Sequence, residues 1–216
     1  MNKVIFDKQI REAWNHSFSG WDFAYVADRM IESPFPWDYH KLVLERIKTA
    51  YSLLDLDTGG GEFLASLQPL PKDTFATEGY VPNIPIAKER LKPFGVKVIE
   101  ATSAVSLPFE NDYFDLVINR HGGIDASEIY RILKPGKWFI TQQVSGKNNI
   151  QLNELLQDEV EYEYSVDTLA HTKEQLEASG LMITDQREEY PEVAYGYRSC
   201  GLLFESNPLA GKEFYD

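Results

Sequence analysis

A turn that combines carboxylates with glycines carries the first chemical signal in this sequence. Residues 55–61 read DLDTGGG, after an apolar segment and before one that favours a helix. Glycines at a strand-to-helix turn let the backbone approach a ligand, and the helix that follows offers unpaired N–H groups. Asp55, four residues before Gly59, favours a ligand with a positive charge or hydroxyl groups near this turn.

Two common nucleotide-binding motifs do not fit this turn. The dinucleotide fingerprint G-x-G-x-x-G fails because Leu64 stands where the third glycine should be. The phosphate-binding loop fails because no Gly-Lys-Ser/Thr follows the glycines. The turn therefore predicts a cofactor site that is not built around a pyrophosphate.

A second carboxylate, Glu78, ends the second predicted strand and lies 23 residues after Asp55. An acidic residue at that place accepts hydrogen bonds from ribose hydroxyls in dinucleotide folds, and we expect the same here. The alternative is an ordinary surface carboxylate at the end of a strand.

Strand and helix patterns alternate from residue 52 onward, and such alternation predicts parallel strands joined by helical crossovers. After these lie two more helix patterns, at 150–158 and 171–179, and two more strand patterns, at 181–188 and 199–205. The alternating part has predicted strands at 52–57, 74–77, 96–100, 114–119 and 138–144, and predicted helices at 61–68, 83–92 and 124–133.

Residues 1–50 predict an N-terminal helical cap, followed by an α/β domain over residues 51–216. Helical spacing of apolar residues covers 6–18 and continues over 21–31, and residues 33–36 (SPFP) break it. Asp38 is placed to cap the next helix. The segment is rich in aromatic residues, which either pack the helices onto the sheet or line a pocket.

The composition of the chain disfavours several kinds of partner and site. The chain has 216 residues and a net charge of −13, which disfavours nucleic acid because phosphate binding depends on Lys and Arg. One cysteine, Cys200, excludes a disulfide framework and a multi-cysteine metal site. The sequence contains no two histidines at helix-face spacing with an acidic partner, so no metal site is predicted. The sequence shows no leader and no apolar run that could span a bilayer, so a cytoplasmic protein is expected.

Three further motifs give the glycine turn a family context. The turn resembles motif [DE]-x-G-x-G-x-G of class I S-adenosylmethionine-dependent methyltransferases, with Asp57 in the place of the first glycine. Residues 107–117 (LPFENDYFDLV) resemble the family's LPF-x-x-x-x-FD-LV signature, and residues 131–138 (RILKPGKW) resemble its R-x-LKPGG-x turn, with Lys137 replacing the second glycine. Glu78 lies at the family's ribose-binding position. The TGGGE loop and the aromatic N-terminal segment resemble a bacterial branch that has a helical lid.

This resemblance implies a Rossmann-like, mostly parallel sheet of seven strands flanked by helices, with an antiparallel last strand and an N-terminal helical lid. It implies S-adenosylmethionine as cofactor. The implied cofactor-binding residues are Asp55, Asp57, Thr58, Gly59, Gly60, Gly61, Glu78, Gly79, Ser103, Ala104, Asn119 and Arg120.

His121 follows the fourth predicted strand and is the candidate general base, because the pKa of free histidine lies near neutrality. The alternative is a structural loop histidine that hydrogen-bonds the backbone. Gln142 and Gln143 are candidates to contact a polar substrate, or else ordinary groups at a strand end.

The predicted function is methyl transfer to a small molecule. A second hypothesis is an RNA methyltransferase, although the sequence shows no basic surface and no Asn/Asp-Pro-Pro-aromatic motif. A non-catalytic protein that binds S-adenosylmethionine is the third reading.

Overall fold

The computed structural model describes residues 3–16, 25, 27, 30–101, 106–160 and 165–195. The chain divides into two compact units, residues 1–37 with 189–216 and residues 38–188. The first unit contains α1 (Lys3–Trp14) and a small antiparallel sheet, in which β1 (Met30–Glu32) pairs with β7 (Val193–Tyr195). The helix expected over residues 21–31 is wrong at its end, because residues 30 and 31 belong to β1.

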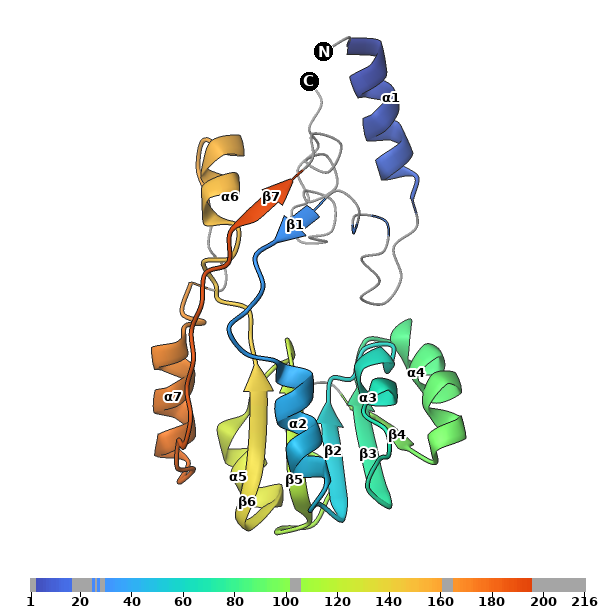
Figure 1. Ribbon diagram of the computed structural model, residues 1–216, viewed down its shortest axis with the longest axis vertical. Coiled ribbons are helices and arrows are strands. Elements are labelled where there is room, and N and C mark those ends of the chain that lie inside the picture. The colour runs from blue at the N-terminus through green and yellow to red at the C-terminus, as the bar shows by residue number, and fades with distance from the viewer. Residues whose placement is uncertain are drawn as a thin grey trace. The chain divides into compact units, whose positions relative to one another are not determined.

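The second unit is built on a five-stranded sheet whose order is β4-β3-β2-β5-β6 (Figure 1). Every pairing in it is parallel, as the alternating patterns predicted. All five residues of the central strand β2 are buried, which is typical of a parallel strand covered on both faces. The strands are β2 (Ser52–Leu56), β3 (Asp73–Glu78), β4 (Lys97–Glu100), β5 (Phe114–Arg120) and β6 (Leu133–Gln142).

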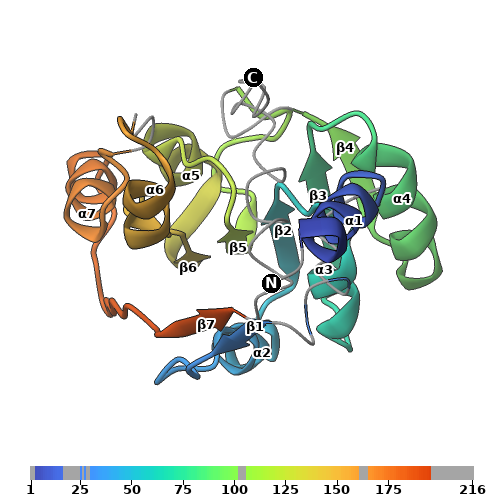
Figure 2. The same cartoon turned by 90° about the horizontal axis from the view of Figure 1, so that it is seen from above.

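Helices cover both faces of this sheet, and α2 and α5 lie on opposite sides of it in Figure 2. Consecutive residues Leu53 and Leu54 point into different core clusters, as the two-residue period of a strand requires. One cluster takes residues from α2 (Tyr39–Ile47), α3 (Glu62–Ser66) and α4 (Asn83–Leu91), and the other from α5 (Ala126–Ile132). A short 3-10 helix η1 (Lys92–Phe94), α6 (Ile150–Leu156) and α7 (Leu169–Ala178) complete the unit.

The helix α2 begins as the sequence predicted. Asp38 is its N-cap, and the Asp38 side chain accepts a hydrogen bond of 3.0 Å from the Lys41 amide. Tyr39, Val43 and Ile47 are buried at four-residue intervals, which gives the helix one apolar face. This helix, which the sequence grouped with the N-terminal cap, is part of the second unit. The role of residues 1–50 as a lid stays a prediction.

The C-terminal part of the predicted fold differs from the structure. The strand expected at 181–188 is wrong, since these residues have no regular structure and Met182 is exposed. The strand expected at 199–205 lies outside the described residues. The described part of the sheet has five parallel strands, and neither a seven-stranded sheet nor an antiparallel last strand is confirmed. Over the described ranges, none of the helices is long and apolar enough to cross a membrane.

Arg131 joins the two motifs that flank β5. Its guanidinium donates to the backbone oxygens of Phe109, at 2.7 Å, and Leu107, at 3.1 Å. Glu128 accepts from the Leu107 amide at 2.6 Å and pairs with Arg131. The Leu-Pro-Phe segment is therefore fixed to α5 by residues that lie 21 to 24 positions apart along the chain.

Lys137, which replaces a family glycine, has a structural partner. Its ammonium lies 3.2 Å from Asp115, and Lys134 lies 3.3 Å from the same carboxylate. Asp115 also accepts from the amides of Tyr51, at 2.9 Å, and Ser52, at 3.2 Å. These contacts lower the pKa of Asp115, although burial opposes them, and they tie the start of β2 to β5 and β6.

We expect Gly61→Ala to destabilise the second unit more than Gly95→Ala does. Both glycines have left-handed backbones, with φ of 81° and 72°, so each substitution carries a backbone penalty of about 1–2 kcal/mol. A Cβ on Gly61 would lie 2.9 Å from Leu91 Cγ, whereas one on Gly95 would meet no atom within 4 Å. Urea unfolding should therefore show an additional loss of about 1–3 kcal/mol for Gly61→Ala. Equal losses would contradict the packing role of Gly61.

Candidate active site

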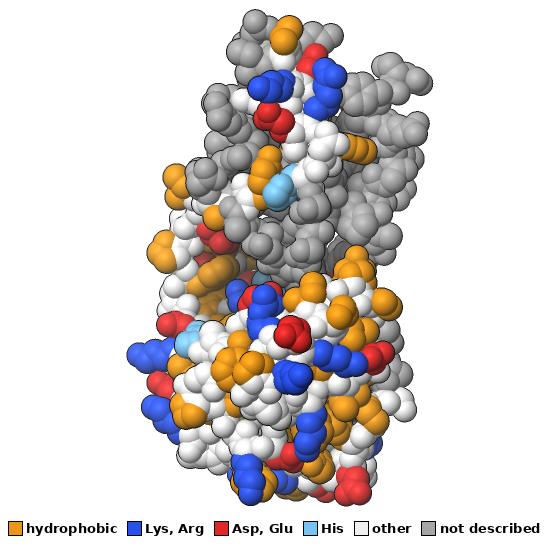
Figure 3. All heavy atoms as spheres, turned by 90° about the vertical axis from the view of Figure 1, so that its right-hand side faces the viewer, with side chains coloured by type: hydrophobic (Ala, Val, Ile, Leu, Met, Phe, Trp, Pro, Cys, Tyr) orange, Lys and Arg blue, Asp and Glu red, His pale blue; other side chains and the backbone are white. Residues whose placement is uncertain are grey.

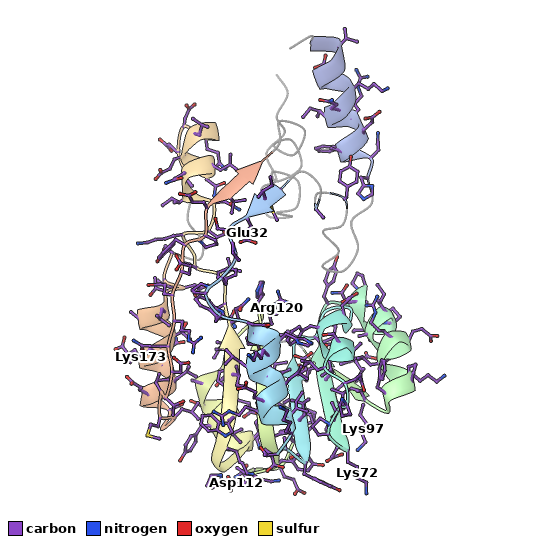
Figure 4. All side chains as sticks on the ribbon, in the orientation of Figure 1. Glu32, Lys72, Lys97, Asp112, Arg120 and Lys173 are labelled. Atoms are coloured by element: carbon purple, nitrogen blue, oxygen red, sulfur yellow. The ribbon has the colours of Figure 1, made fainter. Side chains whose placement is uncertain are left out.

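The candidate site is built at the carboxyl ends of β2, β3 and β5, where open α/β sheets bind their ligands. Asp55 pairs with Ile118 and Leu56 with Asn119 in the parallel register between β2 and β5. Figure 4 places Arg120 at this end of the sheet, with Asp112, Lys72 and Lys97 at the opposite end. The structure thus brings together site residues that the sequence placed in three separate segments.

Asp55 is a buried carboxylate, only 3% exposed. Thr58 donates a hydrogen bond of 2.6 Å from its hydroxyl to Asp55 Oδ2. Burial raises the pKa of Asp55 to about 7, with smaller raising effects from Asp57 and Glu78, while Thr58 and Arg120 lower it. A buried anion of this kind is stabilised when a cationic or hydroxyl-bearing ligand approaches it.

Asp57 joins the β2 turn to the β5 turn. Its backbone is left-handed, with φ of 55°, which Asp tolerates better than most residues. Its amide donates to Thr77 Oγ1 at 3.1 Å, and its carboxylate accepts from the Gly123 amide at 3.2 Å. A Cβ on Gly122 would lie 2.6 Å from Asp57 Oδ2, so the two turns approach each other closely. Asp57 is therefore a structural cross-link where the family has glycine.

The three consecutive glycines have different roles. Gly59 has a left-handed φ of 63°, which continues the tight turn. The carbonyl of Gly60 accepts from Arg90, which also pairs with Glu62. Gly61 allows Leu91 of α4 to pack against the turn. Backbone conformation thus accounts for Gly59, and the close approach of Leu91 accounts for Gly61.

Glu78 lies at the end of β3 and is 5% exposed. Its Oε1 accepts from the Tyr80 amide at 2.7 Å, across the turn that Gly79 begins. No described residue bonds its second oxygen. Its register partner Glu100 differs, because Glu100 is exposed and pairs with Lys88 at 2.5 Å. The orientation of Glu78 is thus fixed while one carboxylate oxygen stays available.

Asn119 is fully buried, and its amide is fixed in orientation. Its Nδ2 donates to the backbone oxygens of Leu56, at 3.2 Å, and Gly123, at 3.5 Å. Its Oδ1 accepts from Gln143 and, at 3.5 Å, from Thr141. Asn119 therefore holds three strand ends together.

Tyr39 is a site residue that sequence reasoning missed. Its hydroxyl donates toward the backbone oxygens of Asn119 and Ile140, each at 3.1 Å. Burial first and Asp55 second raise the pKa of this phenol, so it stays protonated. The sequence offered two indirect signals for it, its place beside the helix cap Asp38 and its membership of the aromatic N-terminal segment.

Arg120 and His121 follow Asn119 at the end of β5. Arg120 lies 5.3 Å from the ring of Phe63, a cation–π contact. His121 has a left-handed φ of 65°, and its amide donates to Gln142 O at 3.0 Å. Burial, followed by the charge of Arg120, lowers the pKa of His121 to about 4. No described residue hydrogen-bonds the His121 ring, which is neutral at pH 7.

The remaining expected residues contribute differently. Ser103 and Ala104 lie outside the described residues. Phe109, from the Leu-Pro-Phe segment, packs edge-to-face on Phe75 and Phe114 in the core, at ring distances of 5.2 and 4.8 Å. Across the described ranges, no group of three His, Cys, Asp or Glu side chains could hold a metal ion.

Comparison with known protein families gives one match that covers this site. Residues 54–141 match the family model described as "Methyltransferase domain". This segment runs from β2 to β6 and includes every described residue of the expected cofactor set. No protein with curated function matches the chain.

Several solved structures share the fold. A SAM-dependent methyltransferase from Aquifex aeolicus is 19% identical with a TM-score of 0.55, over 74% of this chain and 88% of that one. A putative methyltransferase from Haloferax volcanii, in complex with the Trm112 methyltransferase activator, is 22% identical with a TM-score of 0.52, over 68% and 70%. The [4+2]-cyclase SpnF is 21% identical with a TM-score of 0.55, over 68% of this chain and only 57% of its own length. These TM-scores show a common fold, and the names of the matched proteins include both methyltransferases and a cyclase.

Proposed function

We propose a function from one premise, that the chain carries a class I S-adenosylmethionine-dependent methyltransferase domain and uses S-adenosylmethionine as cofactor. The proposed reaction is methyl transfer to a small molecule. The observation that supports it best is the pair of buried carboxylates, Asp55 and Glu78, at neighbouring strand ends beside the cation Arg120.

The residues present fit this cofactor, which supplies a methyl group on a sulfonium sulfur. Asp55 suits its ammonium group, because a cation offsets the cost of burying the carboxylate. The available oxygen of Glu78 suits the ribose hydroxyls, and Arg120 suits the carboxylate of the amino-acid part. The loop residues Thr58, Gly59, Gly60, Gly61 and Gly79, with Ser103, Ala104 and Asn119, complete the proposed set, and Asp57 supports it through Gly123.

Transfer of this kind is an in-line displacement that depends mostly on positioning. In the proposed mechanism His121 accepts the proton that an O–H or N–H acceptor loses as the new bond to carbon forms. The pKa of His121, lowered to about 4, keeps its ring unprotonated at neutral pH, and the same shift makes it a weaker base than free histidine.

The charge distribution favours a small molecule over RNA as the methyl acceptor. On the face drawn in Figure 3, basic and acidic side chains of the second unit are interspersed. With a net charge of −13, phosphate binding would require a concentrated basic surface. Retention on RNA that falls steeply with salt would favour the RNA reading instead.

Calorimetric titration with S-adenosylmethionine and S-adenosylhomocysteine tests the cofactor site. We expect Glu78→Ala to bind both compounds at least tenfold more weakly than wild type does, because the variant loses two hydrogen bonds to ribose. Glu100→Ala is the matched control, since Glu100 lies beside Glu78 in the sheet but pairs with a surface lysine. Equal binding by all three proteins would contradict the ribose role. Tight binding without turnover of any acceptor would favour the non-catalytic reading.

A further inference from the structure

The amide of Gln143, one residue beyond the end of β6, is held in one orientation by its neighbours. Both protons of its Nε2 are directed at protein oxygens, one at Asn119 Oδ1 and the other at Thr141 Oγ1, which lies 2.7 Å away. Asn119 cannot reverse its own amide to accommodate a reversed Gln143, because its Nδ2 donates to Leu56 O and Gly123 O. The network therefore determines which end of the Gln143 amide points away from it.

The end that points away is the carbonyl oxygen. No described residue donates to Gln143 Oε1, and the Gln143 side chain is exposed. The neighbouring strand end carries Arg120 and His121, and the His121 amide bonds the carbonyl of Gln142 in the adjacent position. The oriented acceptor thus belongs to the strand end that pairs with the one carrying the proposed base, and both strand ends belong to the same unit.

We propose that Gln143 determines substrate specificity, and that its carbonyl oxygen accepts a hydrogen bond from an O–H or N–H group of the methyl acceptor. This inference rests on the proposed function and names the class of substrate, a small molecule that carries a hydrogen-bond donor. A pre-oriented group loses little entropy on binding, so one such bond contributes measurably to affinity.

The test uses matched pairs of small probes on protein saturated with S-adenosylhomocysteine. The donor compounds are phenol, aniline and catechol, and their twins without donors are anisole, N,N-dimethylaniline and veratrole. We expect wild type to bind each donor compound about three- to tenfold more tightly than its twin, in titrations followed by ligand-observed NMR. Gln143→Met should abolish the difference, because methionine has no acceptor oxygen at this position.

Gln175→Met is the control, because Gln175 is an exposed residue of α7 whose side chain hydrogen-bonds His171 and lies outside the proposed site. Calorimetry with S-adenosylhomocysteine on every variant distinguishes a failure of the proposed cofactor site from a failure of the proposed role of Gln143. If wild type does not bind S-adenosylhomocysteine, the proposed function is contradicted. Normal binding of S-adenosylhomocysteine with no donor preference, or with a preference that survives in Gln143→Met, would overturn the role of Gln143 alone.

Discussion

Asp55→Asn should stabilise the free protein and weaken cofactor binding at the same time. The pKa of Asp55 is raised to about 7 in the folded state from 3.8, so the folded state binds more protons than the unfolded state between these values. The free energy of unfolding therefore falls as pH rises from about 4 to 7 and is constant above that. Asparagine removes this loss, and we expect it to add about 1–4 kcal/mol of stability at pH 8.

Urea unfolding of wild type and Asp55→Asn at pH 4.5 and pH 8 measures this effect. The difference between the two proteins should be small at pH 4.5, where Asp55 is protonated, and largest at pH 8. Other carboxylates affect both proteins alike, so the difference isolates Asp55. A variant that is less stable than wild type at pH 8 would mean that the carboxylate is satisfied within the protein itself.

Cofactor affinity should change in the opposite direction. Wild type should bind S-adenosylmethionine more tightly as pH rises through 7, since the ionised carboxylate attracts the ammonium group. Asp55→Asn should bind at least tenfold more weakly at pH 8 and should lose this pH dependence. Calorimetry at pH 6 and pH 8 measures both quantities. Unchanged affinity in the variant would assign Asp55 a structural role only.

The central sheet could be predicted because its signals are local. Parallel strands buried on both faces are short apolar runs, and β2, β3 and β5 lie within a residue or two of their predicted positions. The pairing of β1 with β7 could not be predicted, since each strand has three residues and their sequence separation exceeds 160 residues. The segment 181–188 begins with the apolar residues of a strand pattern, but no strand in the described part of the chain pairs with it.

The motifs predicted which residues lie near the proposed cofactor site, whereas the contacts that these residues make within the protein could not be predicted. Asp57 and Lys137 depart from the family pattern, and both departures are explained by tertiary partners, Gly123 for one and Asp115 for the other. Such partners lie far away in sequence and leave no spacing pattern. The orientation of the Gln143 amide depends on a network over three strand ends, which only the folded chain brings together.

His121→Asn should reduce the rate of methyl transfer about 10²–10⁴-fold, the usual contribution of a general base, and leave cofactor affinity unchanged. Asparagine accepts the left-handed backbone that His121 adopts, with φ of 65°, so the variant removes the ring without adding backbone strain. The measurement is the initial rate of S-adenosylhomocysteine formation at saturating cofactor, with the donor probe that wild type methylates fastest.

The pH profile distinguishes a base from a positioning group. Because the pKa of His121 is lowered to about 4, protonation removes the base only below about pH 5, and not near 6.5 as for a free histidine. At saturating cofactor the wild-type rate should therefore stay flat from pH 6 to 8 and decline toward pH 4, and His121→Asn should lack that decline. A variant with the full wild-type rate would mean that positioning alone drives transfer and that the acceptor loses its proton to water.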